Sequence, residues 1–497
     1  MPNLIFSTPL VAGPPGAAPV GVTLALYAPF GTDAVLSTYP GGSVLPIQQH
    51  ALVQHLLKVS ECGVHVSALI DLHDDDSYLV DIPANKPLSM QIASRWKQDM
   101  QSPRTLAGFL RRARQLHPET ALVLALEGHG AGFLPEIDRS QLSTEQLTQG
   151  GEVAWQLGSE HGEPVLPMGS PLLPMGSPLL PMGSPLLPVN HMPLSTWGLA
   201  TALKDALGGG AGSGRKLAAI HFNNCFNMAV EVLHTVAPYA DYATGYMNYN
   251  FFTGGETYPA VFNKLKIAGN ATTQQLSQWL AEANRDLLAT KTHHPTTGAA
   301  VQLSRMPLIA ARVDALAQAL VAALTGAPAA ERPTVVGRIR TAIIRAQQYD
   351  TGTNARLDVP DELTDLRSLA EQLMAFAGSA AVVAAATQLH QALATIKVYG
   401  ASATPWIAPD IVWDFSSRQL AMNILCPDPV LRGLWDWRSP FYLQKAPTPA
   451  QPQVIDFLKS TAWVDFIIEY HKQAKFVGLL PAAIPGYPIF DRKLTLP

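Results

Sequence analysis

Two short apolar runs in the middle of the chain each end in a residue type that thiol chemistry requires. Residues 121–126 lead into the sequence EGHG, which holds His129, and residues 217–222 lead into NNC, which ends at Cys225. A cysteine becomes a nucleophile when a histidine within hydrogen-bond reach accepts its proton. Cysteine in such a stretch is more often a small buried apolar residue, but the two asparagines indicate that the chain is leaving the core. We therefore predict Cys225 as nucleophile and His129 as its base.

Glycines flank His129, and they bear on what the backbone can do there. A lone histidine is usually structural, but Gly128 and Gly130 let the main chain take unusual dihedral angles and approach a ligand closely. Attack on a carbonyl group needs N–H donors aimed at the oxygen that becomes negative. We expect the N–H groups of Gly130 and Cys225 to form such an oxyanion hole.

The pattern around Cys225 also bears on its protonation. A helical pattern over residues 228–236 follows the cysteine, so we expect Cys225 to open a helix. The positive end of the helix dipole would then favour the thiolate. Both motifs fall at the carboxyl ends of expected strands, where open α/β sheets gather their ligands.

Residues 20–265 alternate strand-like and helix-like patterns after a Pro/Gly-rich lead-in over residues 1–19. Strands are expected over 20–27, 64–70, 121–126, 217–222 and 242–247, and helices over 47–58, 104–116 and 228–236. Strands separated by helices imply crossover connections. The fold class is therefore α/β, with a mostly parallel sheet and helices on both faces.

The chain is largely helical from residue 266 to residue 400, because apolar residues recur there at helical spacing. Helices are expected over 273–290, 307–324, 336–348, 361–376 and 380–399, with Asp361 as the N-cap of the fourth. Residues 401–497 are richer in tryptophan and proline. We expect strands and loops there that pack back on the first domain, with a helix over 462–473.

A sequence repeat interrupts the α/β pattern. The heptapeptide LPMGSPL occurs three times over residues 166–186, inside an expected insertion loop over 132–195. Each copy carries two prolines, which break helices, so irregular or polyproline-like chain is expected rather than a coiled coil. One interpretation is a low-complexity surface loop, and the other is a loop on which an activator or target protein docks.

The composition excludes several classes of partner. Charged residues make up 14% of the chain, against about 25% in an average globular protein. The net charge is −4 and no basic stripe or zinc-ligand spacing is present, so nucleic-acid binding is not expected. No uninterrupted apolar run reaches the roughly 18 residues of a membrane span, so membrane insertion is not expected.

Cysteine usage and the first residues point to a reducing compartment. Cys62, Cys225 and Cys426 are odd in number and far apart, which implies no disulfide framework. Residues 1–19 lack the basic and apolar regions of a secretory signal. We predict a cytoplasmic location.

The tract His73–Asp76 holds one histidine and three aspartates. It reads either as a solvated turn or as a calcium site, since carboxylate oxygens suit that ion. We expect no required cofactor, with calcium as the one candidate.

Several further stretches, in the right order, resemble one known family, the clostripain-like cysteine peptidases, in the same clan as caspases, gingipains, legumain and separase. The stretches that carry the resemblance are Arg104–Leu110 and the strand into His129-Gly130, Asn223–Phe226, Val230–Val232, Tyr239–Tyr242, Gly254–Tyr258, Asp365–Leu373, Leu420–Pro427 and Trp463–Phe466. The resemblance implies a caspase-like α/β/α domain over 20–265, with Cys225 as nucleophile and His129 as the catalytic histidine. It also implies an acyl-enzyme thioester formed from a peptide or protein substrate.

The chain departs from the family at the expected substrate pocket. Family members carry aspartate two residues before the cysteine, where it pairs with arginine or lysine at the P1 position of the substrate. This chain has Asn223 there, and an amide does not supply the charge that binds a buried guanidinium. Asp241 and Glu256 are the candidates to supply it.

We therefore predict a cysteine endopeptidase that acts by limited proteolysis, with a helical C-terminal extension. The first alternative is a catalytically inactive pseudo-protease that uses the same groove to bind a protein. A second is a metal-dependent hydrolase built on His73–Asp76 and His129.

Overall fold

The structure is a computed structural model. It describes residues 21–31, 36, 46–72, 77–96, 98–138, 194–208, 216–250, 253–269, 271–291, 296–349, 362–399, 406–408, 411–413, 415, 419–430 and 438–478. The repeats at 166–186, most of the insertion at 132–195, and His73–Asp76 lie outside these residues.

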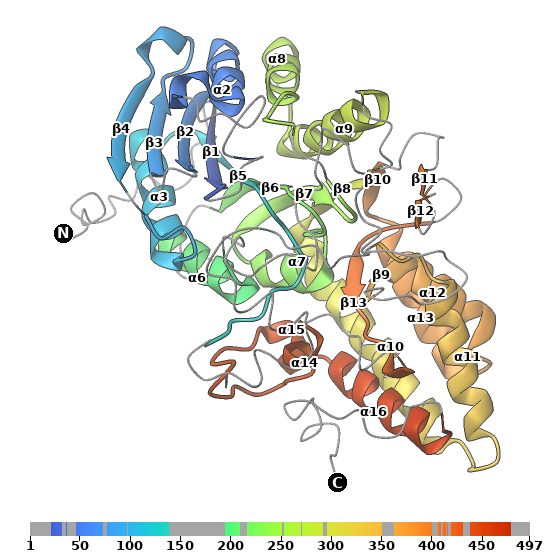
Figure 1. The fold of residues 1–497 in the computed structure, drawn as a ribbon. Coiled ribbons are helices and arrows are strands. Elements are labelled where there is room, and N and C mark those ends of the chain that lie inside the picture. The colour runs from blue at the N-terminus through green and yellow to red at the C-terminus, as the bar shows by residue number, and fades with distance from the viewer. Residues whose placement is uncertain are drawn as a thin grey trace.

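A mixed sheet of nine strands forms the centre of the molecule, in the order β10-β8-β7-β6-β5-β1-β2-β3-β4 (Figure 1). The five strands from β2 to β7 in that order are parallel, and two antiparallel strands extend each side. The bounds are β1 Val22–Pro29, β2 His65–Asp71, β3 Ser77–Ile82, β4 Gln91–Trp96, β5 Ala121–Glu127, β6 Leu217–Asn223, β7 Ala240–Tyr246, β8 Gly298–Gln302 and β10 Lys397–Tyr399.

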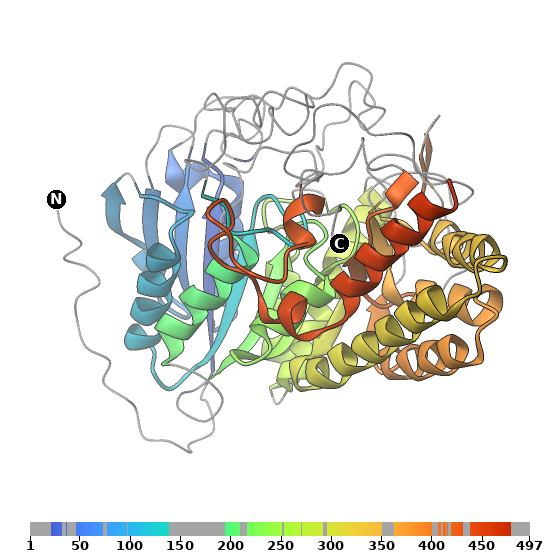
Figure 2. The same ribbon diagram turned by 90° about the horizontal axis from the view of Figure 1, so that it is seen from below.

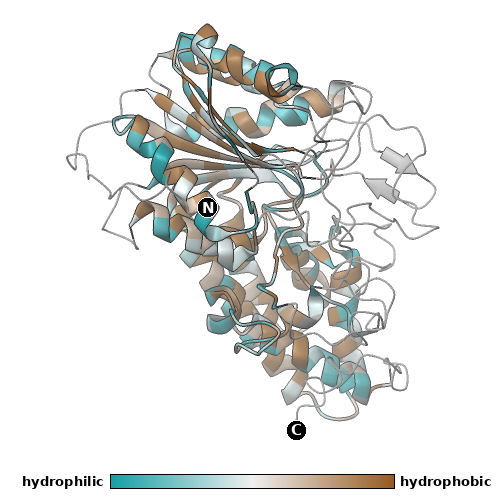
Figure 3. Cartoon of the chain, turned by 60° about the vertical axis from the view of Figure 1, so that its left-hand side comes forward, coloured by the Kyte–Doolittle hydropathy of each residue, from teal (hydrophilic) through white to brown (hydrophobic). Residues whose placement is uncertain are grey.

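The central strands are apolar along their whole length because helices cover both faces of the sheet. In β5 every residue after Ala121 is buried, and β1 is buried from Thr23 to Pro29. A parallel sheet buried on both faces produces such continuous apolar runs. Figure 3 shows the same pattern, with hydrophobic strands inside and hydrophilic residues on the outer helix faces.

Two groups of helices form the outer layers, as Figure 1 shows. The first group is α2 Ala51–Glu61, α8 Tyr258–Ala268 and α9 Thr273–Lys291, and the second is α3 Pro103–Leu116, α6 Thr196–Leu207 and α7 Val230–Val236. α3 illustrates the local cause, because Leu106, Phe109, Leu110 and Ala113 recur at helical spacing and are all buried.

The second half of the chain builds a helical layer beside the sheet (Figure 2). Its helices are α10 Met306–Gly326, α11 Arg332–Arg345, α12 Leu366–Phe376, α13 Ala380–Leu393 and α16 Trp463–Phe476. Among the described residues one helical segment, Leu303–Gly326, is long and apolar enough to cross a membrane by length and composition alone. It packs between α13 and α16, with Val313, Leu316 and Leu320 fully buried.

The last part of the chain returns to the sheet. β13 Asn423–Leu425 pairs with β9 Leu363–Asp365, and the short helices α14 Ser439–Tyr442 and α15 Asp456–Ser460 follow. A further strand pair joins β11 Trp406–Ala408 to β12 Ile411–Trp413. α15 packs against α7, and Asn423 forms a bridge with Ala229, so this region adjoins the residues that follow β6.

The predicted α/β class with a mostly parallel sheet is confirmed, and most predicted elements are present. The sequence did not reveal the antiparallel strands β3, β4, β8 and β10 that extend the sheet. β8 and β10 come from beyond residue 265, so the sheet does not end at that expected boundary. The fourth predicted helix begins later, at Leu366, where Asp365 caps it by accepting a hydrogen bond from Ser368 N.

Candidate active site

The carboxyl ends of β5 and β6 lie side by side. These strands are parallel neighbours in which Glu127 pairs with Asn223, so His129 and Cys225 each follow the paired residue by two positions. A Cβ atom placed on Gly130 would lie 2.3 Å from the carbonyl oxygen of Cys225. The backbones of the two loops are therefore in direct contact, and only glycine fits at this position.

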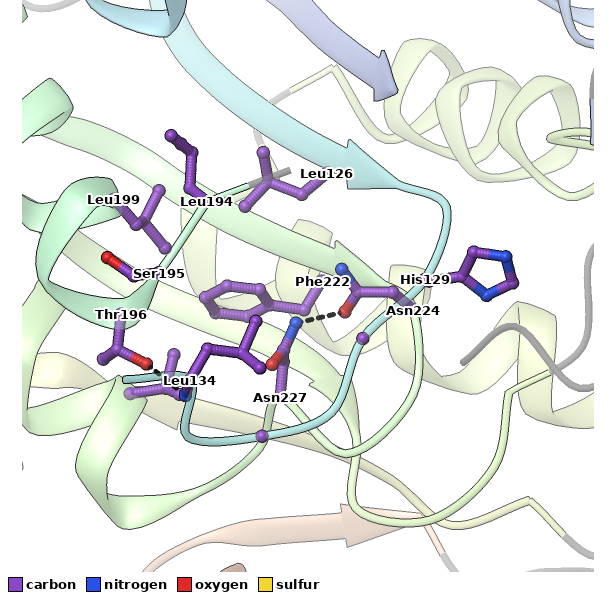
Figure 4. A pocket seen from close by; sticks show the side chains of 13 residues that line it. Leu126, His129, Leu134, Leu194, Ser195, Thr196, Leu199, Phe222, Asn224 and Asn227 are labelled. Carbon is purple, nitrogen blue, oxygen red and sulfur yellow. Dashed lines mark hydrogen bonds between the residues drawn. The ribbon is translucent and has the colours of Figure 1, made fainter. Parts of the chain in front are cut away.

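The loop after β5 is rich in glycine and turns by means of it. Gly128 and Gly132 have φ angles of +95° and +72°, in the left-handed region that residues with a side chain avoid. His129 lies between them and is 6% exposed. Figure 4 shows its imidazole directed away from the leucines and the phenylalanine that line the neighbouring pocket.

The loop after β6 holds Cys225 in a fully buried position. Its thiol donates a hydrogen bond to Asn250 O (3.2 Å), and Asn250 N donates one to its sulfur (3.1 Å). Burial raises the pKa of the Cys225 thiol well above its usual range. α7 begins only at Val230, so Cys225 does not lie in the first turn of a helix. The expectation that a helix dipole favours the thiolate is therefore wrong for this structure.

Phe226, the residue after the cysteine, has φ +62° although it carries a bulky side chain. A residue of this kind in the left-handed region costs about 1–3 kcal/mol and persists only where its surroundings hold it. Its N–H donates to Asn248 O (3.2 Å), and its ring packs edge-on against Tyr249 with centroids 4.7 Å apart. The turn that carries Cys225 is thus held by contacts rather than by glycine.

A buried polar network extends from Cys225 away from the apolar pocket. The side chain of Asn250 donates to Asn223 Oδ1 (3.0 Å) and accepts from Asn284 Nδ2 (2.6 Å). Asn223 Nδ2 lies 3.0 Å from both carboxylate oxygens of Glu127, and Tyr258 also donates its hydroxyl to Glu127. The network fixes the Asn223 amide with its N–H₂ group toward Glu127.

Glu127 is the one acidic group of this network, and it has no exposed surface. Burial raises its pKa to about 7, although the hydrogen bonds from Tyr258 and Asn223 oppose that rise. His221, on β6, packs edge-on against Tyr258, and burial lowers the pKa of this histidine to about 3. His221 is therefore a neutral core residue.

The structure does not bring all the predicted pocket residues together. Asp241 is exposed near the beginning of β7, where the preceding Ala240 pairs with the first residue of β6. It therefore lies at the opposite end of the sheet from Cys225. Glu256 is half-buried in the turn before α8, two residues from Tyr258, which contacts the network.

A small pocket adjoins the two loops on the side of α6 and α7. Its lining is mostly apolar, including Leu126, Leu134, Leu199 and Phe222, with Asn224 and Asn227 at one edge (Figure 4). Its volume is about 30 Å³, which is room for one or two water molecules. His129 and Gly130 also line this pocket, whereas Cys225 does not, so the thiol does not face it.

No group of three or more histidine, cysteine, aspartate or glutamate side chains able to hold a metal occurs within the described residues. Calcium therefore stays a sequence-based candidate, on a tract outside them. The cysteines Cys62, Cys225 and Cys426 are all free.

Sequence reasoning missed the residues that hold the site. Asn250, Tyr258 and Asn423 come from segments up to 198 residues beyond Cys225. Tyr258 and Asn423 lie in stretches that carry the family resemblance, but no part in the site was predicted for either of them. No role was assigned to Glu127 either. A signal was present for Glu127, because an acidic residue directly after five buried apolar positions needs a polar partner in the fold.

Comparison with known proteins identifies the family that this site resembles. The model of the clostripain family matches residues 197–403, a segment that includes Cys225. A secreted C11 cysteine protease from Bacteroides thetaiotaomicron, called iotapain, has a TM-score of 0.53 at 12% identity, covering 90% of this chain and all of that one. An inactive zymogen C11 protease from Parabacteroides distasonis has a TM-score of 0.50 at 13% identity, covering 86% and 99%.

At these identities the solved structures establish the fold alone. No curated protein matches the chain at a significant level. The resemblance to the clostripain family is confirmed over the matched residues, and so is the caspase-like α/β fold. Family and fold together support a cysteine-type peptidase.

Proposed function

We propose that the chain is a cysteine endopeptidase that works through a dyad of Cys225 and His129. The sulfur of Cys225 attacks the carbonyl carbon of the scissile peptide bond, and His129 accepts the thiol proton. His129 then gives that proton to the leaving amine as the C–N bond breaks, which leaves an acyl-enzyme thioester. Water, deprotonated by His129, cleaves the thioester and restores the thiol.

The observation that carries this proposal is the backbone contact between the two loops. A Cβ on Gly130 would meet the Cys225 carbonyl oxygen at 2.3 Å, and this direct contact between the two segments supports a single site. We assign the N–H groups of Gly130 and Cys225 to the oxyanion hole on the same ground.

The raised pKa of the buried Cys225 thiol determines how the reaction starts. The resting nucleophile is neutral, so it is activated by proton transfer to His129 rather than by a pre-formed thiolate. The first step, the attack of the thiol on the carbonyl carbon, should therefore already require the His129 imidazole.

We assign Asn223 to the floor of the pocket for the P1 side chain. Its amide directs N–H₂ toward Glu127, and its oxygen accepts from Asn250, so the floor itself is neutral. The nearest described carboxyl is Glu127, whose pKa of about 7 leaves it largely protonated in mild acid. Basic P1 side chains should accordingly be accepted better above neutral pH than below it.

Two features favour the pseudo-protease alternative, in which the groove only binds a protein. Cys225 is fully buried with both backbone groups of Asn250 on its sulfur, and Asn223 stands where the family has aspartate. A binding module needs neither an accessible thiol nor a charged pocket floor.

Labelling with a peptidyl electrophile separates the two functions. The peptidase predicts a covalent adduct on Cys225, located by mass spectrometry, and hydrolysis of a quenched peptide library that Cys225→Ala abolishes. Cys62→Ala serves as the matched control and should leave hydrolysis unchanged. Absence of both adduct and hydrolysis, with and without calcium, would refute the peptidase and favour the binding module.

The partner and the compartment are parts of the same proposal. A peptide or protein is the substrate class that the family binds, and docking of a protein on the repeat loop stays a prediction. The iotapain structure is described as that of a secreted protease, so the cytoplasmic location is tested by fractionation rather than assumed.

A further inference from the structure

One side chain from the C-terminal region reaches the turn that carries Cys225. Asn423, the first residue of β13, is fully buried. Its Nδ2 atom donates to the carbonyl oxygens of Phe226 (2.8 Å) and Met247 (3.0 Å). Its backbone N–H donates to Met228 O (3.0 Å). Asn423 therefore joins the residues just after the cysteine to the end of the neighbouring strand.

The amide group is suited to this position. Both hydrogen atoms of Asn423 Nδ2 have a carbonyl partner, whereas its Oδ1 atom is buried and has no hydrogen-bond partner within the described part of the chain. A buried acceptor left in this way is unfavourable. An aliphatic side chain would avoid that cost, so the two donated bonds are what asparagine supplies here.

The turn needs an external support because of Phe226. Its left-handed backbone is unfavourable for a phenylalanine, and it directly follows Cys225. Without the bond from Asn423, the Phe226 carbonyl would be buried with one partner fewer. The turn would then relax toward an ordinary backbone conformation and move the adjoining sulfur.

The support is itself firmly anchored. The carboxylate of Asp365, in β9, accepts hydrogen bonds from Ala421 N (2.9 Å), Ser368 N (2.7 Å) and the hydroxyl of Tyr349 (2.8 Å). β9 pairs with β13, where Asn423 lies opposite Asp365. The pairing of β13 with the buried strand β9 thus fixes the position of Asn423.

A second contact ties the same C-terminal region to the histidine loop. Arg438, which is fully buried, donates a hydrogen bond through Nη1 to the carbonyl oxygen of Ala131, two residues after His129. The C-terminal region therefore contacts both loops of the candidate site.

We propose that Asn423 is a positioning residue for the reaction, which keeps the sulfur of Cys225 in line with its base and with the scissile carbonyl. This inference rests on the proposed peptidase function. Loss of the amide should lower kcat and leave KM nearly unchanged, since its two donated hydrogen bonds go to the turn and to the end of β7 rather than to a residue assigned to the substrate pocket.

The test compares three variants of the full chain with the wild type on one quenched peptide. Asn423→Leu removes both donors at similar volume, and Asn423→Asp keeps the shape but places oxygen against the two carbonyls. Thr364→Val is the matched control, because it removes a buried hydrogen bond to Gln348 (2.9 Å) from the paired strand without touching the turn. We expect kcat to fall about 100-fold or more in both Asn423 variants, with KM within about threefold, as for a misplaced nucleophile.

The pH profile of Asn423→Asp supplies a readout that a merely structural role would not move. Protonation of the new carboxyl restores one O–H donor and removes the repulsion between negative oxygen and carbonyl. The ratio of variant to wild-type kcat should therefore rise as the pH is lowered, whereas the ratio for Asn423→Leu should stay flat.

Amide hydrogen exchange over residues 224–229 tests the support without relying on catalysis. Exchange there should accelerate in Asn423→Leu and not in Thr364→Val. The inference is overturned if exchange is unchanged, if Asn423→Leu keeps more than half the wild-type kcat, or if Thr364→Val loses as much activity. A wild-type chain that neither cleaves peptides nor labels at Cys225 would refute the proposed function and the catalytic role of Asn423, with exchange still reporting on the turn.

Discussion

The two loops of the candidate site solve the same problem in different ways. Each must turn sharply at the end of a parallel strand to present a side chain. The histidine loop uses Gly128 and Gly132, whose left-handed backbone is intrinsically accessible. The cysteine loop has no glycine between residues 224 and 229, and it turns at Phe226 under contacts from Asn423 and Tyr249.

The difference indicates which parts of the chain each loop depends on. A glycine turn depends on residues next to one another in the chain, so the histidine motif can be recognised in the sequence. A strained turn is encoded by distant partners, so the cysteine loop depends on the C-terminal region. The C-terminal region is therefore expected to be necessary for catalysis, although it contributes no reacting atom.

The largest effect should come from filling the contact between the loops. In Gly130→Ala the new methyl group would lie 2.3 Å from the Cys225 carbonyl oxygen, so one loop must move. We expect kcat/KM to fall about 100-fold or more, as a displacement of about 1 Å costs in catalysis. Steady-state kinetics on a quenched peptide measures this loss. Near-wild-type activity would show that the two loops are not in direct contact.

A double-mutant cycle tests whether glycine can replace the external support. In a Phe226→Gly background the left-handed backbone is no longer strained, so the turn should depend less on Asn423. The fold-loss of kcat caused by Asn423→Leu should be about tenfold smaller in that background, within the range of coupling seen for contacting residues. Equal losses in both backgrounds would contradict the contrast between the loops.

A smaller effect concerns the polar network beneath the cysteine loop. Between about pH 4.5 and 7 the folded protein keeps a proton on Glu127 that the unfolded chain has released. Stability therefore falls as the pH rises through this interval, by about 3 kcal/mol for a shift of this size, and is level above it. Glu127→Gln should remove that part of the slope and be more stable than the wild type at pH 8. Urea unfolding at pH 5 and pH 8 measures the free energy of unfolding of both proteins. An equal change between the two pH values in the wild type and in Glu127→Gln would indicate that Glu127 is ionised throughout.

The smallest effect is expected on the side of the apolar pocket. Asn227 donates to Asn224 Oδ1 (2.7 Å), whereas the Cys225 thiol is hydrogen-bonded to Asn250. Asn227→Ala should change kcat/KM by less than about threefold and cost about 1 kcal/mol of stability, the value of one hydrogen bond. A loss comparable with that of Asn423→Leu would mean that both sides of the loop position the sulfur.

The sequence was sufficient for the parts of the fold with strong periodicity. The apolar runs before His129 and Cys225 and the amphipathic pattern of 104–116 gave strands and helices close to their observed bounds. β8 and β10 escaped notice because strands of five and three residues carry too short a pattern to stand out. The family motifs around Cys225 could be recognised because their residues lie close together in the sequence.

The supporting residues of the site could not be predicted in the same way. Asn250 and Asn423 are ordinary asparagines until the fold brings them to the cysteine loop, 25 and 198 positions along the chain. Asp241 illustrates the converse, since a plausible charge near a motif proved to lie at the amino end of β7. Only the topology of the sheet decides which end of a strand a residue occupies.

The most direct test of the central claim, that the two strand ends form one reactive site, is the rate at which a peptidyl acyloxymethyl ketone labels Cys225. We predict a single adduct at Cys225 in the wild type and labelling about 10²–10⁴-fold slower in His129→Ala, the usual contribution of a general base. Equal labelling rates in the two proteins, or an adduct found only on Cys62, would contradict the account.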